Sequence, residues 1–120
     1  MKNPPITTHV LNTALGKPAP GIHLTLWVLK GEQWVMLSTA ITNEDGRINS
    51  WGDASWFEHK TPEQLLGTYK IVFSLERYWQ AQAIDAFYPC AEICFKVQDT
   101  KHHHIPLLLS PYSYSTYRGS

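Results

Sequence analysis

The chain has 120 residues, a length typical of one domain built around a single hydrophobic core. Ten basic and ten acidic residues give a formal net charge of zero, which argues against nucleic acid or an anionic membrane surface as a partner. No apolar run approaches the roughly 20 residues that cross a bilayer, and the first residues lack the apolar core of a signal peptide. We therefore expect one domain over residues 1–120 that works in the cytoplasm.

Short β-rich runs separated by turn signals follow one another along the chain, which is the pattern of an antiparallel β-sandwich. The first three strands are expected at residues 6–12, 22–30 and 34–42. Between the first two, residues 16–21 are rich in proline and glycine and predict a break without helix or strand. After the third, Asp45 and Gly46 predict a turn of the kind that joins strands.

The second half of the chain continues this alternation. Residues 49–67 have no regular pattern, and residues 76–83 form the one helix candidate, about two turns that begin near Ser74 and depend on tertiary packing. Further strands are expected at 67–75, 91–97, 104–110 and 112–117. The sequence thus predicts seven or eight strands and one short helix.

The two cysteines, Cys90 and Cys94, lie four residues apart in one of these strand-like runs. On a strand this spacing puts both on one face, about 13 Å apart at roughly 3.3 Å per residue, which is too far for a disulfide between them. Unpaired thiols are typical of a reducing compartment, and no basic neighbour in the sequence indicates a reactive thiolate. We expect both cysteines to be structural.

Three of the six histidines open one expected strand. Period-two geometry puts His103 on the core face, and His102 and His104 on the opposite face. Three interpretations stay open for this group: an exposed polar strand start, a metal site and a catalytic imidazole. A metal site would need further ligands, and no Cys, Asp or Glu stands at zinc-like spacing. A catalytic imidazole is attractive because an ordinary pKa near about 6.5 lets one side chain both take and give a proton.

Two further residues are candidates for a site. His9 stands within the first expected strand, where a lone histidine is usually a hydrogen-bonded structural group. Arg47 follows the expected turn, where a solvated arginine is the default. Of only three arginines, Arg47 and Arg118 stand in loop or terminal positions, which favours recognition of an oxygen-rich ligand. Composition and spacing alone therefore reach an all-β sandwich with a histidine and arginine site.

Several stretches together resemble the 5-hydroxyisourate hydrolase family, the transthyretin-like enzymes of urate breakdown. The resemblance runs nearly end to end and is carried by ITTHVLNTALGKPAPGI, TNEDGR, GTYKIVF, AFYPCAEICF and HIPLLLSPYSYSTYRGS. The terminal YRGS is its most specific piece, because transthyretin, the hormone carrier with the same fold, shares LLSPYSYST and then continues differently. Segment 48–65 matches the family poorly, so no role is assigned to it, and His59 within it is expected at the surface.

The resemblance implies an all-β, transthyretin-like sandwich of two four-stranded sheets with one short helix after the fifth strand. It implies a homotetramer, a dimer of dimers, with active sites in the channel between dimers. It also implies hydrolysis of an amide-type bond of 5-hydroxyisourate to give 2-oxo-4-hydroxy-4-carboxy-5-ureidoimidazoline, a reaction that needs neither a metal nor another cofactor.

The family motifs fall on particular residues of this chain. The THVL histidine is His9, the DGR arginine is Arg47, and the histidine before IPLLLSP is His104. The tail motif supplies Tyr117, Arg118, Gly119 and Ser120. The resemblance implies that all four tail residues bind substrate.

The resemblance also implies roles in the reaction. His9 and His104 would position and deprotonate water and return a proton to the leaving nitrogen, and which histidine does which stays open. Arg47 would hold the carbonyl oxygens of the substrate and stabilise developing negative charge, and Ser120 would bind substrate or orient a histidine. His103 stands where the family usually has an aromatic residue, most often tyrosine. If one imidazole acts as the base, the rate should fall on acidification through roughly pH 6 to 7.

The last two expected strands form a hairpin. His104 and residues 117–120 are its two ends, so antiparallel pairing should bring them together, and alternation should place Arg118 and Ser120 on one face. Two other functions stay open beside the hydrolase: a non-catalytic carrier with an apolar channel, and a structural or adaptor sandwich.

Overall fold

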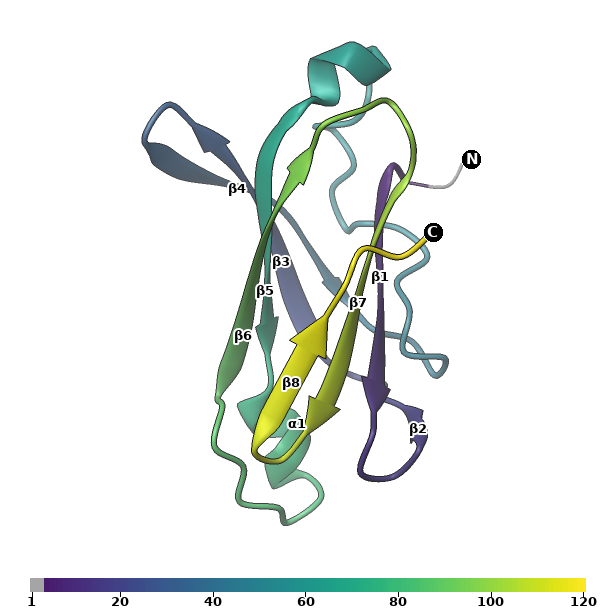
Figure 1. Ribbon diagram of the computed structural model, residues 1–120, viewed down its shortest axis with the longest axis vertical. Coiled ribbons are helices and arrows are strands. Elements are labelled where there is room, and N and C mark those ends of the chain that lie inside the picture. Colours follow the sequence, from purple (N-terminus) through teal and green to yellow (C-terminus); the bar gives the residue numbers. More distant parts are fainter. Residues whose placement is uncertain (1–3) are drawn as a thin grey trace.

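Two four-stranded β-sheets pack face to face in the computed structural model, which describes residues 4–120 (Figure 1). The strands of the first sheet are β1 (Ile6–Asn12), β2 (Lys17–Pro18), β7 (His103–Ser110) and β8 (Ser113–Thr116). The strands of the second sheet are β3 (His23–Lys30), β4 (Gln33–Ile41), β5 (Gly67–Ser74) and β6 (Cys90–Val97). Their spatial orders are β2-β1-β7-β8 and β4-β3-β5-β6. The expected all-β sandwich of two four-stranded sheets is confirmed.

The hydrophobic core lies between the sheets and follows the alternation of the sequence. Every second residue of β1, β3, β5 and β7 faces inward. Buried examples that are no more than 1% exposed are Val10, Leu24, Phe73 and Leu107. Burial of one such side chain stabilises the fold by roughly 1.5–3 kcal/mol. Because the inward positions are fixed in this way, Thr7 and His9 of β1 and His104 of β7 face outward together.

Strands β1 and β7 lie side by side in the middle of the first sheet and run parallel. This pair departs from the antiparallel pattern that the sequence predicted, whereas the other strand pairs within residues 4–120 are antiparallel. The whole second sheet lies between β1 and β7 along the chain, so no short hairpin sets their direction. Their register places Thr7 beside His104 and His9 beside Pro106.

The helix after β5 is shorter than expected. Helix α1 covers Glu76–Gln80 rather than residues 76–83. Residues 81–83 continue as turns, and Ala83 adopts a left-handed φ of 55°, which ends the helical path. Trp79 is 2% exposed and anchors this short helix to the core. No helix in the described part of the chain is long and apolar enough to cross a bilayer.

Two short elements lie where no regular structure was expected. Strand β2, inside the break at residues 16–21, pairs with the end of β1. Pro18 is tolerated there because β2 is an edge strand, where a missing N–H breaks no ladder. The 3-10 helix η1 (Pro62–Leu65) forms in the irregular segment, and Thr61 and Gln64 cap it reciprocally.

The cysteines lie where their spacing predicted. Cys90 and Cys94 are unpaired and exposed on β6, the edge strand of the second sheet. His59, in the irregular segment, is exposed as well.

Candidate active site

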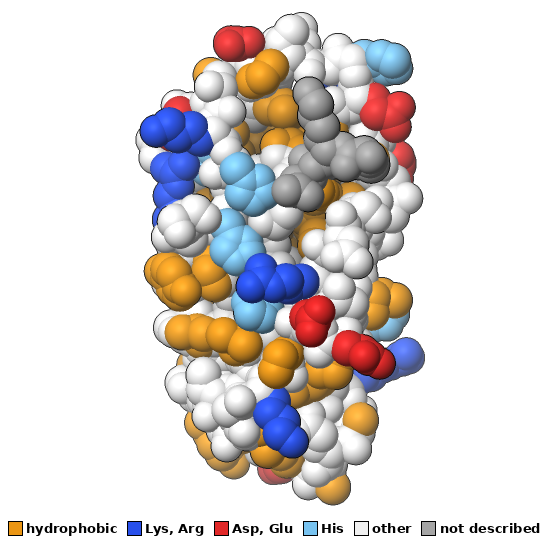
Figure 2. Space-filling model, turned by 90° about the vertical axis from the view of Figure 1, so that its right-hand side faces the viewer, with side chains coloured by type: hydrophobic (Ala, Val, Ile, Leu, Met, Phe, Trp, Pro, Cys, Tyr) orange, Lys and Arg blue, Asp and Glu red, His pale blue; other side chains and the backbone are white. Residues whose placement is uncertain are grey.

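Histidine side chains gather in a column on one face of the molecule, and a basic side chain lies against them (Figure 2). The outer face of the first sheet supplies this group. His9 comes from β1, His104 from the start of β7, and His102 from just before β7. His9 lies one strand across and two residues along from His104, a separation of about 8 Å between Cα atoms.

The His104 ring is held from one side by a hydroxyl. Its Nδ1 lies 2.8 Å from Oγ1 of Thr7, and Nε2 of His102 lies 2.7 Å from the same oxygen. The two imidazoles are stacked with their centroids 6.5 Å apart. His104 is half-buried and His102 is exposed. Among the described residues, Nε2 of His104 has no hydrogen-bond partner and is not buried, so it is open to a ligand.

The turn at residues 43–46 takes the chain from the end of β4, in the second sheet, to the first sheet and so places Arg47 beside His9. Gly46 has a left-handed φ of 74°, and its carbonyl accepts the N–H of Val10 at 2.8 Å. A Cβ on Gly46 would overlap the carbonyl oxygen of Val10, so glycine is required for this close approach. Arg47 then forms an isolated antiparallel bridge with His9. The expected turn is present, but it joins two sheets rather than two strands of one hairpin.

The surroundings favour neutral imidazoles. Burial lowers the pKa of His104 most, and the charges of Arg47, His102 and His9 lower it further. Burial also lowers the pKa of His9, and Arg47 adds to this effect, whereas Asp45 opposes both. Both rings are therefore neutral near pH 7, beside a guanidinium that stays charged. This arrangement offers proton acceptors together with a cation that can stabilise negative charge.

The chain end returns to the start of β7 (Figure 1), where His104 lies, as the hairpin geometry predicted. The N–H of Gly119 donates to the carbonyl of His104 at 2.8 Å, in a bridge that continues the register of β7 and β8. A Cβ on Gly119 would lie 2.6 Å from Cδ2 of His104, so the missing side chain leaves room for the ring. Ser120 follows directly and is exposed.

Arg118 lies on the opposite side of β7, toward Asp99 and His103. Arg118 pairs with Asp99 at 3.4 Å, and Tyr117 lines, with Arg118 and His103, a cavity of about 270 Å³. His103 is 2% exposed on the core face, as expected, and its Nδ1 lies 2.8 Å from the carbonyl of Lys101. Within one chain, the structure therefore brings together His9, Arg47, His104 and Gly119, but not Arg118.

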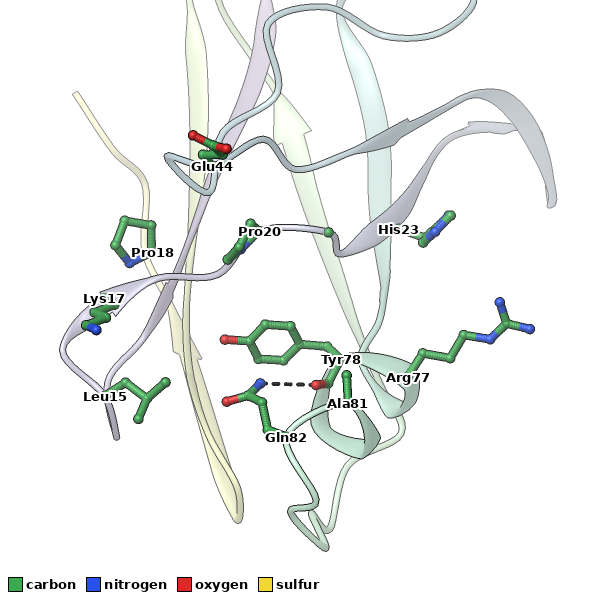
Figure 3. Close-up of a pocket in the computed structure, with 11 residues that line it drawn as sticks. Leu15, Lys17, Pro18, Pro20, His23, Glu44, Arg77, Tyr78, Ala81 and Gln82 are labelled. Carbon is green, nitrogen blue, oxygen red and sulfur yellow. Dashed lines mark hydrogen bonds between the residues drawn. The ribbon is translucent and has the colours of Figure 1, made fainter.

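A wider cavity of about 680 Å³ lies elsewhere, between α1, β2 and the start of β3 (Figure 3). Tyr78 and Gln82 point toward the β2 side of this cavity, whereas Arg77 points away from β2. Neither the histidines of the column nor Arg47 line it. The candidate site is thus an open face that is separate from this cavity.

Sequence reasoning did not single out Thr7 for the site. Its one signal is its position two residues before His9, which puts both side chains on the same face of a strand. Its contact with His104 depends on the parallel register of β1 and β7.

Comparison with known proteins places the chain in a family. A family model described as the HIUase/Transthyretin family matches residues 6–119. A 5-hydroxyisourate hydrolase of Mus musculus is 47% identical over 120 residues, which cover 97% of this chain and 95% of that protein. The structure of Klebsiella pneumoniae 5-hydroxyisourate hydrolase aligns with a TM-score of 0.75 at 29% identity and covers 96% of this chain and 98% of that one. Sea bream transthyretin in complex with thyroxine aligns with a TM-score of 0.81 at 27% identity, over 97% and 95% of the two chains. The chain belongs to the HIUase/Transthyretin family.

Proposed function

We propose that this protein hydrolyses 5-hydroxyisourate to 2-oxo-4-hydroxy-4-carboxy-5-ureidoimidazoline without a metal or other cofactor. One observation carries the proposal: two half-buried imidazoles, kept neutral, share an open face with Arg47. The relative from Mus musculus, named for this activity, supports the choice of substrate.

The chemistry needs few groups. A neutral imidazole takes a proton from water, and the resulting hydroxide adds to the carbonyl carbon of the ring amide. Arg47 stabilises the negative charge that develops on the carbonyl oxygen. The C–N bond then breaks, and the imidazolium returns its proton to the leaving nitrogen. One proton is taken from water and one is given to the leaving nitrogen, so the reaction consumes no net acid.

The remaining roles concern substrate binding. Ser120, next to the tail residue that contacts His104, holds the substrate or orients a histidine. Tyr117 and Arg118 bind substrate in an assembled homotetramer, a dimer of dimers whose sites lie in the channel between dimers. The edge strands β6 and β8 and the exposed side chains of Phe87 and Tyr112 support such an assembly, because open edges and apolar surface favour association.

We propose a cytoplasmic location for the enzyme. The two unpaired cysteines, Cys90 and Cys94, support it, because free thiols persist in reducing compartments.

A direct turnover assay tests the activity. Purified protein should accelerate the loss of ultraviolet absorbance of freshly generated 5-hydroxyisourate. Arg47→Ala and deletion of residues 117–120 should each remove most of this activity, and Arg77→Ala, an exposed arginine on α1, should keep it. Normal turnover in both site variants, or none in the unmodified protein, would overturn the assignment. Tight binding of an aromatic ligand without turnover would indicate a carrier instead.

A further inference from the structure

One hydroxyl connects two of the histidines on the candidate site. Oγ1 of Thr7 is within hydrogen-bond distance of Nδ1 of His104 and of Nε2 of His102. A hydroxyl has a single hydrogen, so when it donates to one ring nitrogen it can only accept from the other. The protonation of the two facing nitrogens is therefore linked through Thr7.

We propose that Thr7 is a positioning residue that fixes the tautomer of His104, and that His102 is the point where the site exchanges protons with solvent. In this arrangement Nδ1 of His104 donates to Thr7, and the hydroxyl of Thr7 donates to Nε2 of His102. Nε2 of His104 then carries a free lone pair on the open face of the sheet. The proposal rests on the proposed hydrolase function and assigns His104 as its base.

The relay conserves protons at every step. Nε2 of His104 takes a proton from water, and its Nδ1 passes a proton to the oxygen of Thr7 while the hydroxyl hydrogen moves to Nε2 of His102. His104 is then neutral with its hydrogen on Nε2, and His102 is a cation that releases its Nδ1 hydrogen to solvent. The reverse sequence supplies a proton to a leaving nitrogen.

Exposure and charge agree with this direction of transfer. His102 is exposed and His104 is half-buried, so solvent reaches the outer ring more readily. Among residues 4–120, the charged and titratable groups that act on His104 are His9 on β1, His102 before β7 and Arg47 after the turn, and no carboxylate is one of them. Gly119, the tail residue against the ring, carries no charge. A positive charge on His104 is therefore unfavourable, and moving it outward to His102 relieves that cost.

His9 lacks an equivalent connection. Within the described residues, no hydroxyl and no second imidazole forms a hydrogen bond with its ring, and the backbone of Asp45 acts on it instead. The sequence does not tell which of His9 and His104 acts as the base, and their hydrogen-bond partners now distinguish the two.

The tautomer can be measured without substrate. Nitrogen-15 NMR of the histidine rings should find the hydrogen of neutral His104 on Nδ1 in the unmodified protein and in Thr7→Ser, which keeps the hydroxyl. Thr7→Val should lose this preference. A hydrogen on Nε2 in the unmodified protein, or an unchanged tautomer in Thr7→Val, would overturn the proposal. Because no substrate is needed, this measurement tests the role of Thr7 in fixing the tautomer even if the protein proves inactive toward 5-hydroxyisourate.

Kinetics test the same residue in turnover. Thr7→Val should lower kcat by about tenfold to a hundredfold with little change in KM, a part of the roughly 10²–10⁴-fold that acid–base catalysis supplies. Thr7→Ser should recover most of the loss. Thr8→Val is the matched control, because the neighbouring threonine donates to the carbonyl of Ile105 on the core face and is remote from the column. Its kcat should be retained although its stability falls, and equal losses in both valine variants would contradict the proposal.

The exchange role of His102 has its own test. His102→Ala should turn over slowly in dilute buffer and recover as imidazole is added at constant pH, because a dissolved imidazole can accept the proton from Thr7. His23→Ala, an exposed histidine of the other sheet, should show no such dependence. A His102→Ala protein that is fully active in dilute buffer, or one that imidazole does not rescue, would exclude this role.

Discussion

Two adjacent histidines on β7 have opposite surroundings. His103 faces the core at 2% exposure, with Nδ1 against a backbone carbonyl, whereas His104 faces outward with Nδ1 against the hydroxyl of Thr7. A carbonyl can only accept a hydrogen bond, so it holds one tautomer, whereas a hydroxyl can exchange donor and acceptor roles. The partner of an imidazole, and not its place in the sequence, therefore decides whether it can move a proton.

Exchanging each histidine separately should give the largest contrast. His104→Gln should lower kcat/KM by about a hundredfold or more, because it removes the proposed base. His103→Phe should keep turnover, since this side chain faces the core and an aromatic ring replaces its buried volume. Turnover assays on both variants, with thermal unfolding to verify folding, check the prediction. Similar losses in the two would mean that the faces of β7 are not functionally distinct.

Adding one methyl group at the chain end should have the next largest effect. Gly119→Ala places a Cβ 2.6 Å from Cδ2 of His104, so the ring or the tail must shift. A displacement near 1 Å at a reacting group can cost roughly a hundredfold in rate, so we expect a loss of tenfold or more in kcat/KM. Gly31→Ala is the control: its Cβ meets nothing within 4 Å, and it tests only the cost of a left-handed backbone. Equal activity of the two variants would refute the role of this contact.

Acidification should affect the His104 face in a defined pH range. Burial, then Arg47, lowers the pKa of His104, so kcat/KM should fall with a midpoint below the ordinary histidine value of about 6.5. The free energy of unfolding should also fall on acidification. Below about pH 6.5 the unfolded chain binds a proton at this histidine that the folded chain does not, so the contribution of His104 to stability is lost as the pH drops toward its lowered pKa. Arg47→Gln should move the His104 midpoint upward in an NMR titration. A midpoint that stays fixed would show that Arg47 does not act on this ring.

The smallest effect is expected on the other face of β7. Asp99→Asn removes the ion pair with Arg118, but both partners are substantially exposed, so thermal unfolding should barely change. Backbone hydrogen bonding from Lys101, and then Arg118, lowers the pKa of Asp99, so Asp99 remains charged down to acidic pH in the unmodified protein. A large drop in the unfolding midpoint of Asp99→Asn would show that this pair, and not the core, fixes the tail.

Much of this arrangement could be predicted from the sequence. Alternation placed His103 inward and His104 outward, and the hairpin of β7 and β8 brought the tail back to His104. The parallel pairing of β1 with β7 could not be predicted, because it depends on how the two sheets stack and not on any local pattern. Thr7 was missed for that reason, since only this register sets it beside His104. The length of helix α1 was overestimated because residues 81–83 form turns that lead to a left-handed residue, Ala83, which the sequence pattern did not reveal.

The pairing of β1 with β7 also determines when the site can form. Thr7 and His104 are 97 positions apart, so their contact closes a loop of nearly the whole chain. Contacts of such sequence separation form late, because chain entropy must be lost before they contribute stability. During synthesis, β1 leaves the ribosome long before β7 and waits with an unpaired edge, a state that invites misassociation. The contact between Thr7 and His104, on which the proposed relay depends, can therefore form only after β7 has been synthesised and has paired with β1.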